Sequence, residues 1–123
     1  MENKITIYVY SKCSTCQKAL RFLDQKLGKS AYIQKEITLT PPNVKDLQKM
    51  LQFQNGNLKK LFNTSGQLYR EMQLNLKLDS MPLDSALKML SHNGMLVKRP
   101  FLLGKDFGLL GFNESVWGKA LMN

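Results

Sequence analysis

The sequence predicts a single α/β domain built on a mixed β-sheet, and three observations lead to this prediction. The chain has 123 residues, enough for one compact domain and too few for two. With 43% hydrophobic and 22% charged residues, its composition is close to that of an ordinary globular protein. The hydrophobic patterns follow the order strand, helix, strand, a helical middle, then two strands and a helix. This order is typical of an α/β fold with parallel and antiparallel strand pairs.

The first third of the chain has the pattern of a β-α-β unit. Residues 4–10 are rich in β-branched and aromatic side chains, which favours a strand. Residues 16–27 carry apolar side chains at helical spacing, and Gly28 follows where a helix commonly ends on glycine. Residues 31–36 form a second short apolar segment. Because a helix connects the two strands, we expect them to be parallel.

The middle of the chain has mainly helical signals. Two prolines followed by Asn43, a good N-cap, predict a helix over residues 44–53. Residues 58–62 predict one or two helical turns. The segment 68–78 has apolar residues at both helical and strand spacing, so both structures remain open there. A further helix is predicted within residues 80–94.

The last third changes character. Residues 95–103 are almost entirely apolar, but Pro100 interrupts them. A hairpin-like turn then leads into a second short strand over residues 107–112. Asn113 or Ser115 is expected to cap a final helix.

Charge and hydropathy exclude several classes of protein. The formal net charge of +9 admits anionic partners, but no dense basic run or nucleic-acid-binding motif accompanies it. We therefore expect no direct nucleic-acid binding. No apolar run approaches the roughly 20 residues that cross a bilayer, and the chain enters its first strand without a signal-peptide pattern. We expect a cytoplasmic protein without membrane contact.

The two cysteines, Cys13 and Cys16, stand three residues apart in a CxxC motif. In a reducing compartment this spacing favours redox chemistry over a structural disulfide. A zinc site is the competing interpretation, but it needs four ligands, and His92 is the single histidine. We expect no metal, and we expect His92 to act as a cation at a helix end.

The motif lies between a predicted strand and a predicted helix. Free N–H groups and the positive dipole end of the helix stabilise a thiolate at Cys13, and Lys12 adds in the same direction. Cys16 would then be the resolving thiol that attacks a sulfur bonded to Cys13. The alternative is a pair of inert thiols that merely occupy a strand–helix junction.

Arg99 and Pro100 form the second feature of interest. A proline within a buried-looking run is explained by a cis peptide bond that turns the chain toward the cysteines, or by an ordinary edge strand. Arg99 could pair with a thiolate or hold an oxyanion, or it could be a surface charge. The predicted substrate-binding residues comprise Lys12, Ser14, Thr15, Arg99 and Pro100.

Taken together, these motifs resemble the ArsC/Spx family, which comprises glutaredoxin-dependent arsenate reductases, Spx-type transcription regulators and uncharacterised relatives. The likeness covers essentially the whole chain, 1–123, and its motifs occur in family order at 4–16, 61–66, 69–71, 79–83, 93–100 and 110–113. The resemblance implies a thioredoxin-like fold with a mixed four-stranded sheet, flanking helices and a helical insertion at about 41–93. It also implies a cis Pro100 beside the cysteine.

The resemblance transfers residue by residue only in part. Cys13 matches the cysteine that attacks arsenate, and Arg99 matches an arginine that binds the oxyanion. The family's histidine and two further arginines fall near Val9, Asn63 and Phe112, which argues against arsenate turnover. In the Spx branch the CxxC motif is a disulfide switch, and Gly56 falls near a glycine at the contact with RNA polymerase.

The leading hypothesis is a thiol–disulfide oxidoreductase with Cys13 as nucleophile, Cys16 as resolving thiol and Arg99 as the electrostatic partner of a thiolate or an anionic substrate. It acts on a small oxyanion or a thiol/disulfide substrate, binds no cofactor, and takes electrons from glutathione with glutaredoxin or from thioredoxin. The alternative is an Spx-like redox-sensing regulator that binds the C-terminal domain of the RNA polymerase α subunit. A third reading is a family member with an intact fold and no turnover.

Overall fold

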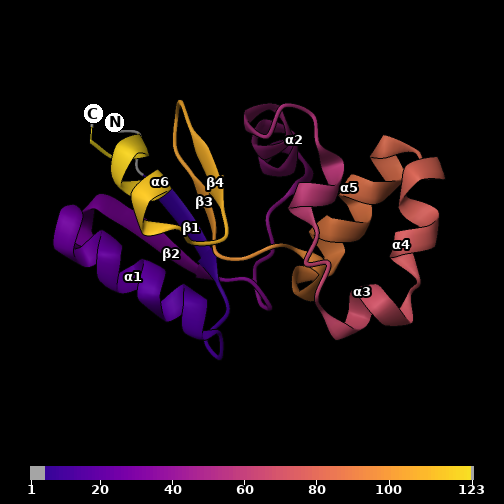
Figure 1. Ribbon diagram of the computed structural model, residues 1–123, viewed down its shortest axis with the longest axis horizontal. Helices are drawn as coiled ribbons and strands as arrows, with labels where there is room; N and C mark the ends of the chain where they lie inside the picture. Colours follow the sequence, from indigo (N-terminus) through magenta and orange to yellow (C-terminus); the bar gives the residue numbers. More distant parts are fainter. Residues whose placement is uncertain (1–4, 123) are drawn as a thin grey trace.

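The computed structural model describes residues 5–122 and centres on a mixed four-stranded sheet (Figure 1). The strands lie side by side in the order β2-β1-β3-β4. Their bounds are β1 Ile5–Val9, β2 Tyr32–Glu36, β3 Phe101–Leu103 and β4 Gly108–Leu110. β1 pairs in parallel with β2 and antiparallel with β3, and β3 pairs antiparallel with β4. The predicted mixed α/β sheet is confirmed.

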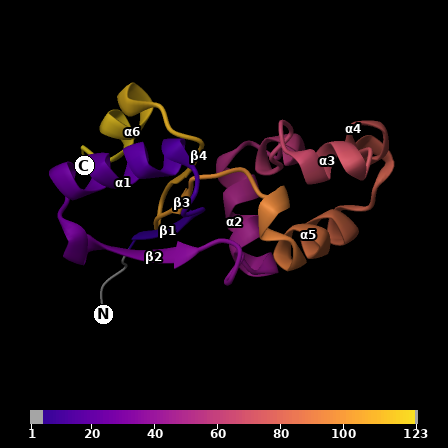
Figure 2. The same ribbon diagram turned by 90° about the horizontal axis from the view of Figure 1, so that it is seen from below.

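Successive side chains of β1 point to opposite faces of the sheet and enter two separate hydrophobic clusters. Ile7 and Val9 pack with helix α1 (Ser14–Lys26) and helix α6 (Glu114–Ala120) on one face. Tyr8 enters the cluster on the opposite face, which belongs mainly to the helical part of the chain. Figures 1 and 2 show α1 and α6 together beside the sheet, away from the other helices.

The helical insertion expected at about 41–93 corresponds to four α-helices that gather on the other side of the sheet (Figures 1 and 2). The α-helices are α2 Val44–Phe53, α3 Gln67–Glu71, α4 Leu74–Lys77 and α5 Leu83–His92. Short 3-10 helices lie at η1 Lys29–Ala31, η2 Leu58–Leu61, η3 Leu78–Ser80 and η4 Gly94–Leu96. Leu47 and Met50 of α2 are fully buried in one cluster with the sheet residue Phe101, so α2 joins the insertion to the sheet. Within residues 5–122 no helix has the length and apolar character to cross a membrane.

Two segments and one peptide bond settle points that the sequence left open or differ from what it predicted. The ambiguous segment 68–78 is helical, broken into short pieces at Gln73, whose φ of 54° is left-handed. Of residues 95–103 only the last three form a strand, because Pro100 has no N–H to donate to a ladder. The Arg99–Pro100 bond is cis, as the resemblance implied.

Gly94 fixes the contact between the insertion and the end of β2. It begins η4 immediately after α5, and a Cβ at this position would overlap the backbone carbonyl of Ile37. Ile37 is itself held, because its N–H donates to the carbonyl oxygen of Val9 at 2.7 Å. The carbonyl therefore has little freedom to move away from an added methyl group.

We expect Gly94→Ala to lower the free energy of unfolding by about 1–3 kcal/mol, because it overpacks a fixed backbone contact. Gly118→Ala in α6 is the matched control, since its Cβ would meet only the Phe22 ring at 3.9 Å. That control should keep or raise stability by up to about 1 kcal/mol. Urea unfolding of both variants measures the difference, and equal stability of the two would contradict this account of Gly94.

Candidate active site

Cys13 is the N-cap of α1, one residue before the helix begins. Its sulfur accepts a hydrogen bond from the backbone N–H of Cys16 at 3.4 Å, and its own N–H donates to the carbonyl oxygen of Tyr10 at 3.0 Å. Both cysteines are free thiols; Cys13 is partly exposed, whereas Cys16 is fully buried. The sulfur of Cys13 thus lies where free helical N–H groups and the helix dipole favour a negative charge.

The Cys16 thiol resists ionisation. Burial raises the pKa of the Cys16 thiol to about 12, and the hydrogen bond and charge of the neighbouring Cys13 act in the same direction. The backbone N–H of Tyr10, 3.5 Å from the Cys16 sulfur, and the positive charge of Arg99 lower the same pKa. At neutral pH Cys16 therefore keeps its proton while the more accessible Cys13 meets the solvent.

Arg99 is held beside the cysteines by three contacts. Its Nη1 atom donates to the carbonyl oxygens of Met95 at 3.2 Å and Val97 at 3.4 Å. Its guanidinium carbon lies 5.0 Å from the centroid of the Tyr10 ring, a cation–π contact. The guanidinium is thus oriented before any substrate arrives.

Tyr10 is a positioning residue that the sequence analysis missed. Its carbonyl holds Cys13, its N–H points at the sulfur of Cys16, and its ring supports Arg99. In the sequence it is only the last residue of a predicted strand. The signal that could have found it is its place directly after β1, where the chain turns into the CxxC motif.

An open cavity of about 450 Å³ lies over this group. Its lining residues are Cys13, Thr15, Asn63, Lys98, Arg99, Leu110, Gly111, Phe112 and Asn113. Of the predicted site residues, the structure brings Cys13, Thr15 and Arg99 to this cavity and buries Cys16 behind them. Lys12 and Ser14 are exposed outside it and Pro100 is buried, so their contact with a substrate stays a prediction.

The positions that carry the family's other oxyanion-binding groups have a different role here. Val9 is buried in the cluster under α1. The Phe112 ring packs edge-on against Trp117 at 5.0 Å and Phe22 at 5.6 Å between ring centroids. Asn63 offers the cavity an uncharged amide. Phe112 therefore takes part in aromatic packing at a position where an oxyanion site would need a guanidinium.

Metal ligands are not gathered in the part of the chain that the structure describes. Among residues 5–122 no group of three His, Cys, Asp or Glu side chains lies close enough to hold a metal ion. His92 is exposed in the last turn of α5, and its Nδ1 atom lies 3.0 Å from the carbonyl oxygen of Lys88. This is the helix-end position that the sequence predicted for it.

The comparisons with known proteins agree with this geometry. The model of the ArsC family matches residues 8–120. The chain belongs to the ArsC family. The ArsC-family resemblance inferred from the motifs is therefore confirmed, and so is the thioredoxin-like arrangement of sheet and helices, which the structural neighbours share.

Similar ArsC-family proteins include both uncharacterised and regulatory chains. The uncharacterized protein YusI of Bacillus subtilis (strain 168) is 39% identical over 110 residues, which cover 89% of this chain and 92% of YusI. The global transcriptional regulator Spx of Streptococcus agalactiae serotype V is 26% identical over 110 residues, covering 89% of this chain and 77% of Spx. A crystal structure of an ArsC family related protein from Bacteroides fragilis superimposes with a TM-score of 0.85 at 36% identity, covering 94% of this chain and 96% of that one.

The support that Tyr10 gives Arg99 can be tested on the closing of the Cys13–Cys16 disulfide. Reaction of Cys13 with one equivalent of dithiobis(nitrobenzoate) releases one nitrothiobenzoate, and attack by Cys16 releases the second. We expect Tyr10→Leu to slow the second release about two- to fivefold, as loss of a cation–π contact of about 0.5–1 kcal/mol predicts. Its pH profile should move to higher pH, because Arg99 lowers the pKa of Cys16.

Tyr10→Phe is the matched control, since it keeps the ring and should close at the wild-type rate. Stopped-flow absorbance from neutral to alkaline pH measures both variants. Equal slowing in Tyr10→Phe, or a pH profile that does not move in Tyr10→Leu, would show that the ring does not act through Arg99.

Proposed function

We propose that this ArsC-family chain is a thiol–disulfide oxidoreductase. The observation that supports it best is the pair of unlike thiols: an accessible sulfur on a helix N-terminus, Cys13, with a buried, protonated thiol, Cys16, directly behind it. Arg99, oriented by Tyr10, supplies a positive charge that lowers the pKa of Cys16.

The proposed reaction has two exchange steps. The Cys13 thiolate attacks one sulfur of a substrate disulfide, a bond forms between the two sulfurs, and the other substrate sulfur leaves as a thiolate. Cys16 then loses its proton and attacks the Cys13 sulfur, which releases the second half of the substrate as a thiolate. The two protein thiols are oxidised to one disulfide, and the substrate disulfide is reduced to two thiols. Glutathione with glutaredoxin, or thioredoxin, is the proposed donor that restores the pair.

The site suits a disulfide or a sulfenic acid as substrate better than it suits arsenate. A tetrahedral dianion needs several convergent cations in fixed positions. Among the described residues that line the cavity, Arg99 and Lys98 are the two cations, and only Arg99 offers a bidentate guanidinium; Phe112 and Asn63 add no charge. A sulfur–sulfur bond is neutral and requires only an accessible nucleophile and a charge to stabilise the leaving thiolate.

We expect Cys13→Ser to abolish reduction of a glutathionylated peptide, because the hydroxyl cannot replace the thiolate at neutral pH. Cys16→Ser should still form a mixed disulfide on Cys13 but should not release it, so the adduct accumulates in a mass spectrum. NADPH oxidation with either donor system measures turnover. Undiminished turnover in Cys13→Ser, or faster turnover of arsenate than of the peptide, would end the proposal.

A second function, a redox-dependent regulator that binds RNA polymerase, is favoured by one further observation. The exposed turn after α2 holds Asn55 at φ 59° and Gly56 at φ 77°, and a Cβ at Gly56 would meet nothing within 4 Å. The turn is thus exposed and accessible at the position that the Spx resemblance assigns to a polymerase contact. The Spx relative described above adds support.

We expect this candidate to show different capture by the isolated C-terminal domain of the polymerase α subunit under oxidising and reducing conditions. Gly56→Arg should abolish capture. Gly28→Arg is the matched control, since Gly28 also has a left-handed φ, 86°, and open space around it. Equal or absent capture in both redox states would exclude this function.

A further inference from the structure

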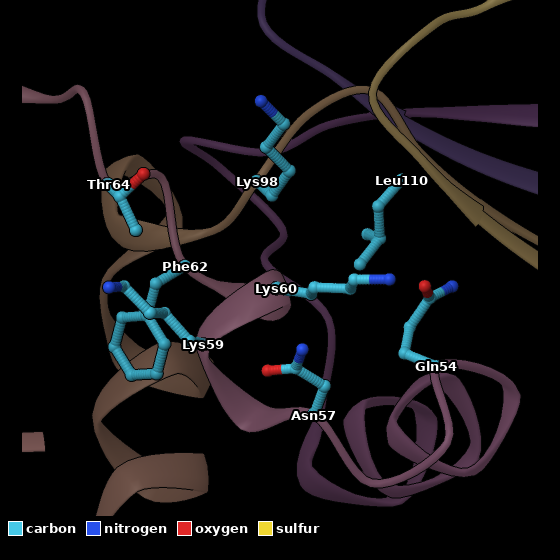
Figure 3. A pocket seen from close by; sticks show the side chains of 8 residues that line it. All are labelled: Gln54, Asn57, Lys59, Lys60, Phe62, Thr64, Lys98 and Leu110. Atoms are coloured by element: carbon cyan, nitrogen blue, oxygen red, sulfur yellow. The ribbon is translucent and has the colours of Figure 1, made fainter. Parts of the chain in front are cut away.

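A second open cavity of about 450 Å³ lies next to the one over Cys13 (Figure 3). The residues that line it are Gln54, Asn57, Lys59, Lys60, Phe62, Thr64, Lys98 and Leu110. Lys98 and Leu110 line both cavities. The two cavities are therefore adjacent, with Lys98 and Leu110 at their border, and we call the two together the lysine groove, from Cys13 to Lys59.

Distant parts of the sequence meet in the lysine groove because of one short backbone pairing. Phe62 forms an isolated antiparallel bridge with Val97, and the N–H of Lys98 donates to the carbonyl oxygen of Leu61 at 2.9 Å. This pairing holds the end of η2, with its lysines, against the segment that leads into β3. The position of these charges beside the cysteine is thus built into the fold.

All charged side chains that line the groove within the described residues are positive: Lys59, Lys60, Lys98 and Arg99. In Figure 3 the side chain of Lys60 reaches across the cavity toward Leu110. Like charges placed together in this way repel each other unless an anion is bound between them. The groove therefore favours an anionic ligand.

Leu110 offers backbone groups to such a ligand. Gly104 and Gly111 donate their N–H groups to the carbonyl oxygens of Phe107 and Pro100, at 2.9 Å each. Because hydrogen-bonded and non-hydrogen-bonded pairs alternate in an antiparallel ladder, Leu110 falls on a non-hydrogen-bonded pair. Its N–H and C=O thus point to the free edge of the sheet, since β4 is an edge strand.

Gly108, two residues before Leu110 on β4, supports this assignment. It also falls on a non-hydrogen-bonded pair, and its carbonyl oxygen accepts a hydrogen bond from Nε2 of Gln54 at 3.0 Å. The Gln54 side chain therefore covers the free edge at Gly108, whereas the edge at Leu110 stays available to a partner. An unpaired edge strand is a common docking place for an extended peptide.

We propose that the lysine groove binds an extended, acidic segment of a protein substrate, whose oxidised cysteine lies over Cys13. The segment pairs its backbone with Leu110 and places its carboxylates near Lys59, Lys60 and Lys98. The charges are spread along the groove on exposed side chains, which suits several carboxylates on a chain better than one small anion. This inference rests on the proposed thiol–disulfide function and names its substrate class.

Two synthetic peptides test the proposal. Each carries one cysteine as a mixed disulfide with nitrothiobenzoate, flanked by glutamates in one peptide and by glutamines in the other. Attack of Cys13 on the peptide sulfur releases nitrothiobenzoate, and attack of Cys16 then releases the peptide thiol, so the protein's own two thiols supply both electrons. We expect the acidic peptide to react faster, with a rate constant that falls as salt is added.

The double variant Lys59→Gln, Lys60→Gln should react with the acidic peptide about three- to tenfold more slowly, as expected for the loss of two partly exposed ion pairs. Its reaction with the glutamine peptide should slow less than about twofold. Lys77→Gln with Lys88→Gln is the matched control, because it removes the same net charge from exposed positions on α4 and α5 (Figure 1). Equal slowing in both double variants, or equal rates of the two wild-type peptides, would overturn the proposal. An N-methyl group on the peptide bond expected over Leu110 should also slow the acidic peptide.

A binding measurement separates failure of the groove from failure of the chemistry. Fluorescein-labelled versions of the peptides with serine in place of cysteine are titrated with Cys13→Ser protein, and anisotropy reports binding. Preference for the acidic peptide supports the groove even if neither disulfide is reduced, an outcome that would overturn the oxidoreductase function alone. Equal binding of both peptides, or competition by inorganic phosphate at the concentration of the peptide, would overturn the groove.

Discussion

The antiparallel pairing of β1 with β3 is the constraint on which the candidate site depends. Its register places Tyr8 opposite Phe101, and two residues beyond this pair in each segment the guanidinium of Arg99 lies over the Tyr10 ring. Directly opposed side chains on one face of a sheet lie about 4.5–5.5 Å apart at Cβ, so the guanidinium meets the Tyr10 ring and hence the turn that carries Cys13. A slip of one residue would move these side chains to opposite faces and separate Arg99 from the cysteines.

The two cysteines differ because they occupy different positions at the start of α1: Cys13 is its N-cap and Cys16 lies within its first turn. Cys13 precedes α1 and stays partly exposed, whereas Cys16, three residues on, packs under the helix against β1. A negative charge on Cys13 raises the pKa of Cys16 and so keeps Cys16 protonated while Cys13 is free. In the proposed reaction that charge is gone once the Cys13 sulfur is in a mixed disulfide, and Arg99 then favours the Cys16 thiolate. Burial and charge together would thus delay the second thiol until the first has reacted.

Local signals predicted the parts of the structure that depend on neighbouring residues. The strand, the CxxC turn and the following helix could be predicted because propensity, capping and spacing agree over residues 4–27. The segment 68–78 could not, because its apolar residues fit two periods and the break at Gln73 needs a left-handed backbone that glutamine rarely adopts. The lysine groove could not be predicted either. It exists through the Phe62–Val97 bridge, a pairing of residues far apart in the sequence that no local pattern encodes.

The distribution of charge bears on the class of substrate that the proposed function involves. A site for a small dianion must direct several cations at one point. In this chain Phe112 instead packs with Phe22 of α1 and Trp117 of α6, so it helps to hold these two helices together and cannot be exchanged for a charge without loss of that packing. The remaining cations are separated: Arg99 and Lys98 line the cavity over Cys13, and Lys98, Lys59 and Lys60 line the adjacent one. Separated charges beside a free strand edge are complementary to a chain and not to a compact ion, so the proposed nucleophile, Cys13, is placed to favour an extended partner.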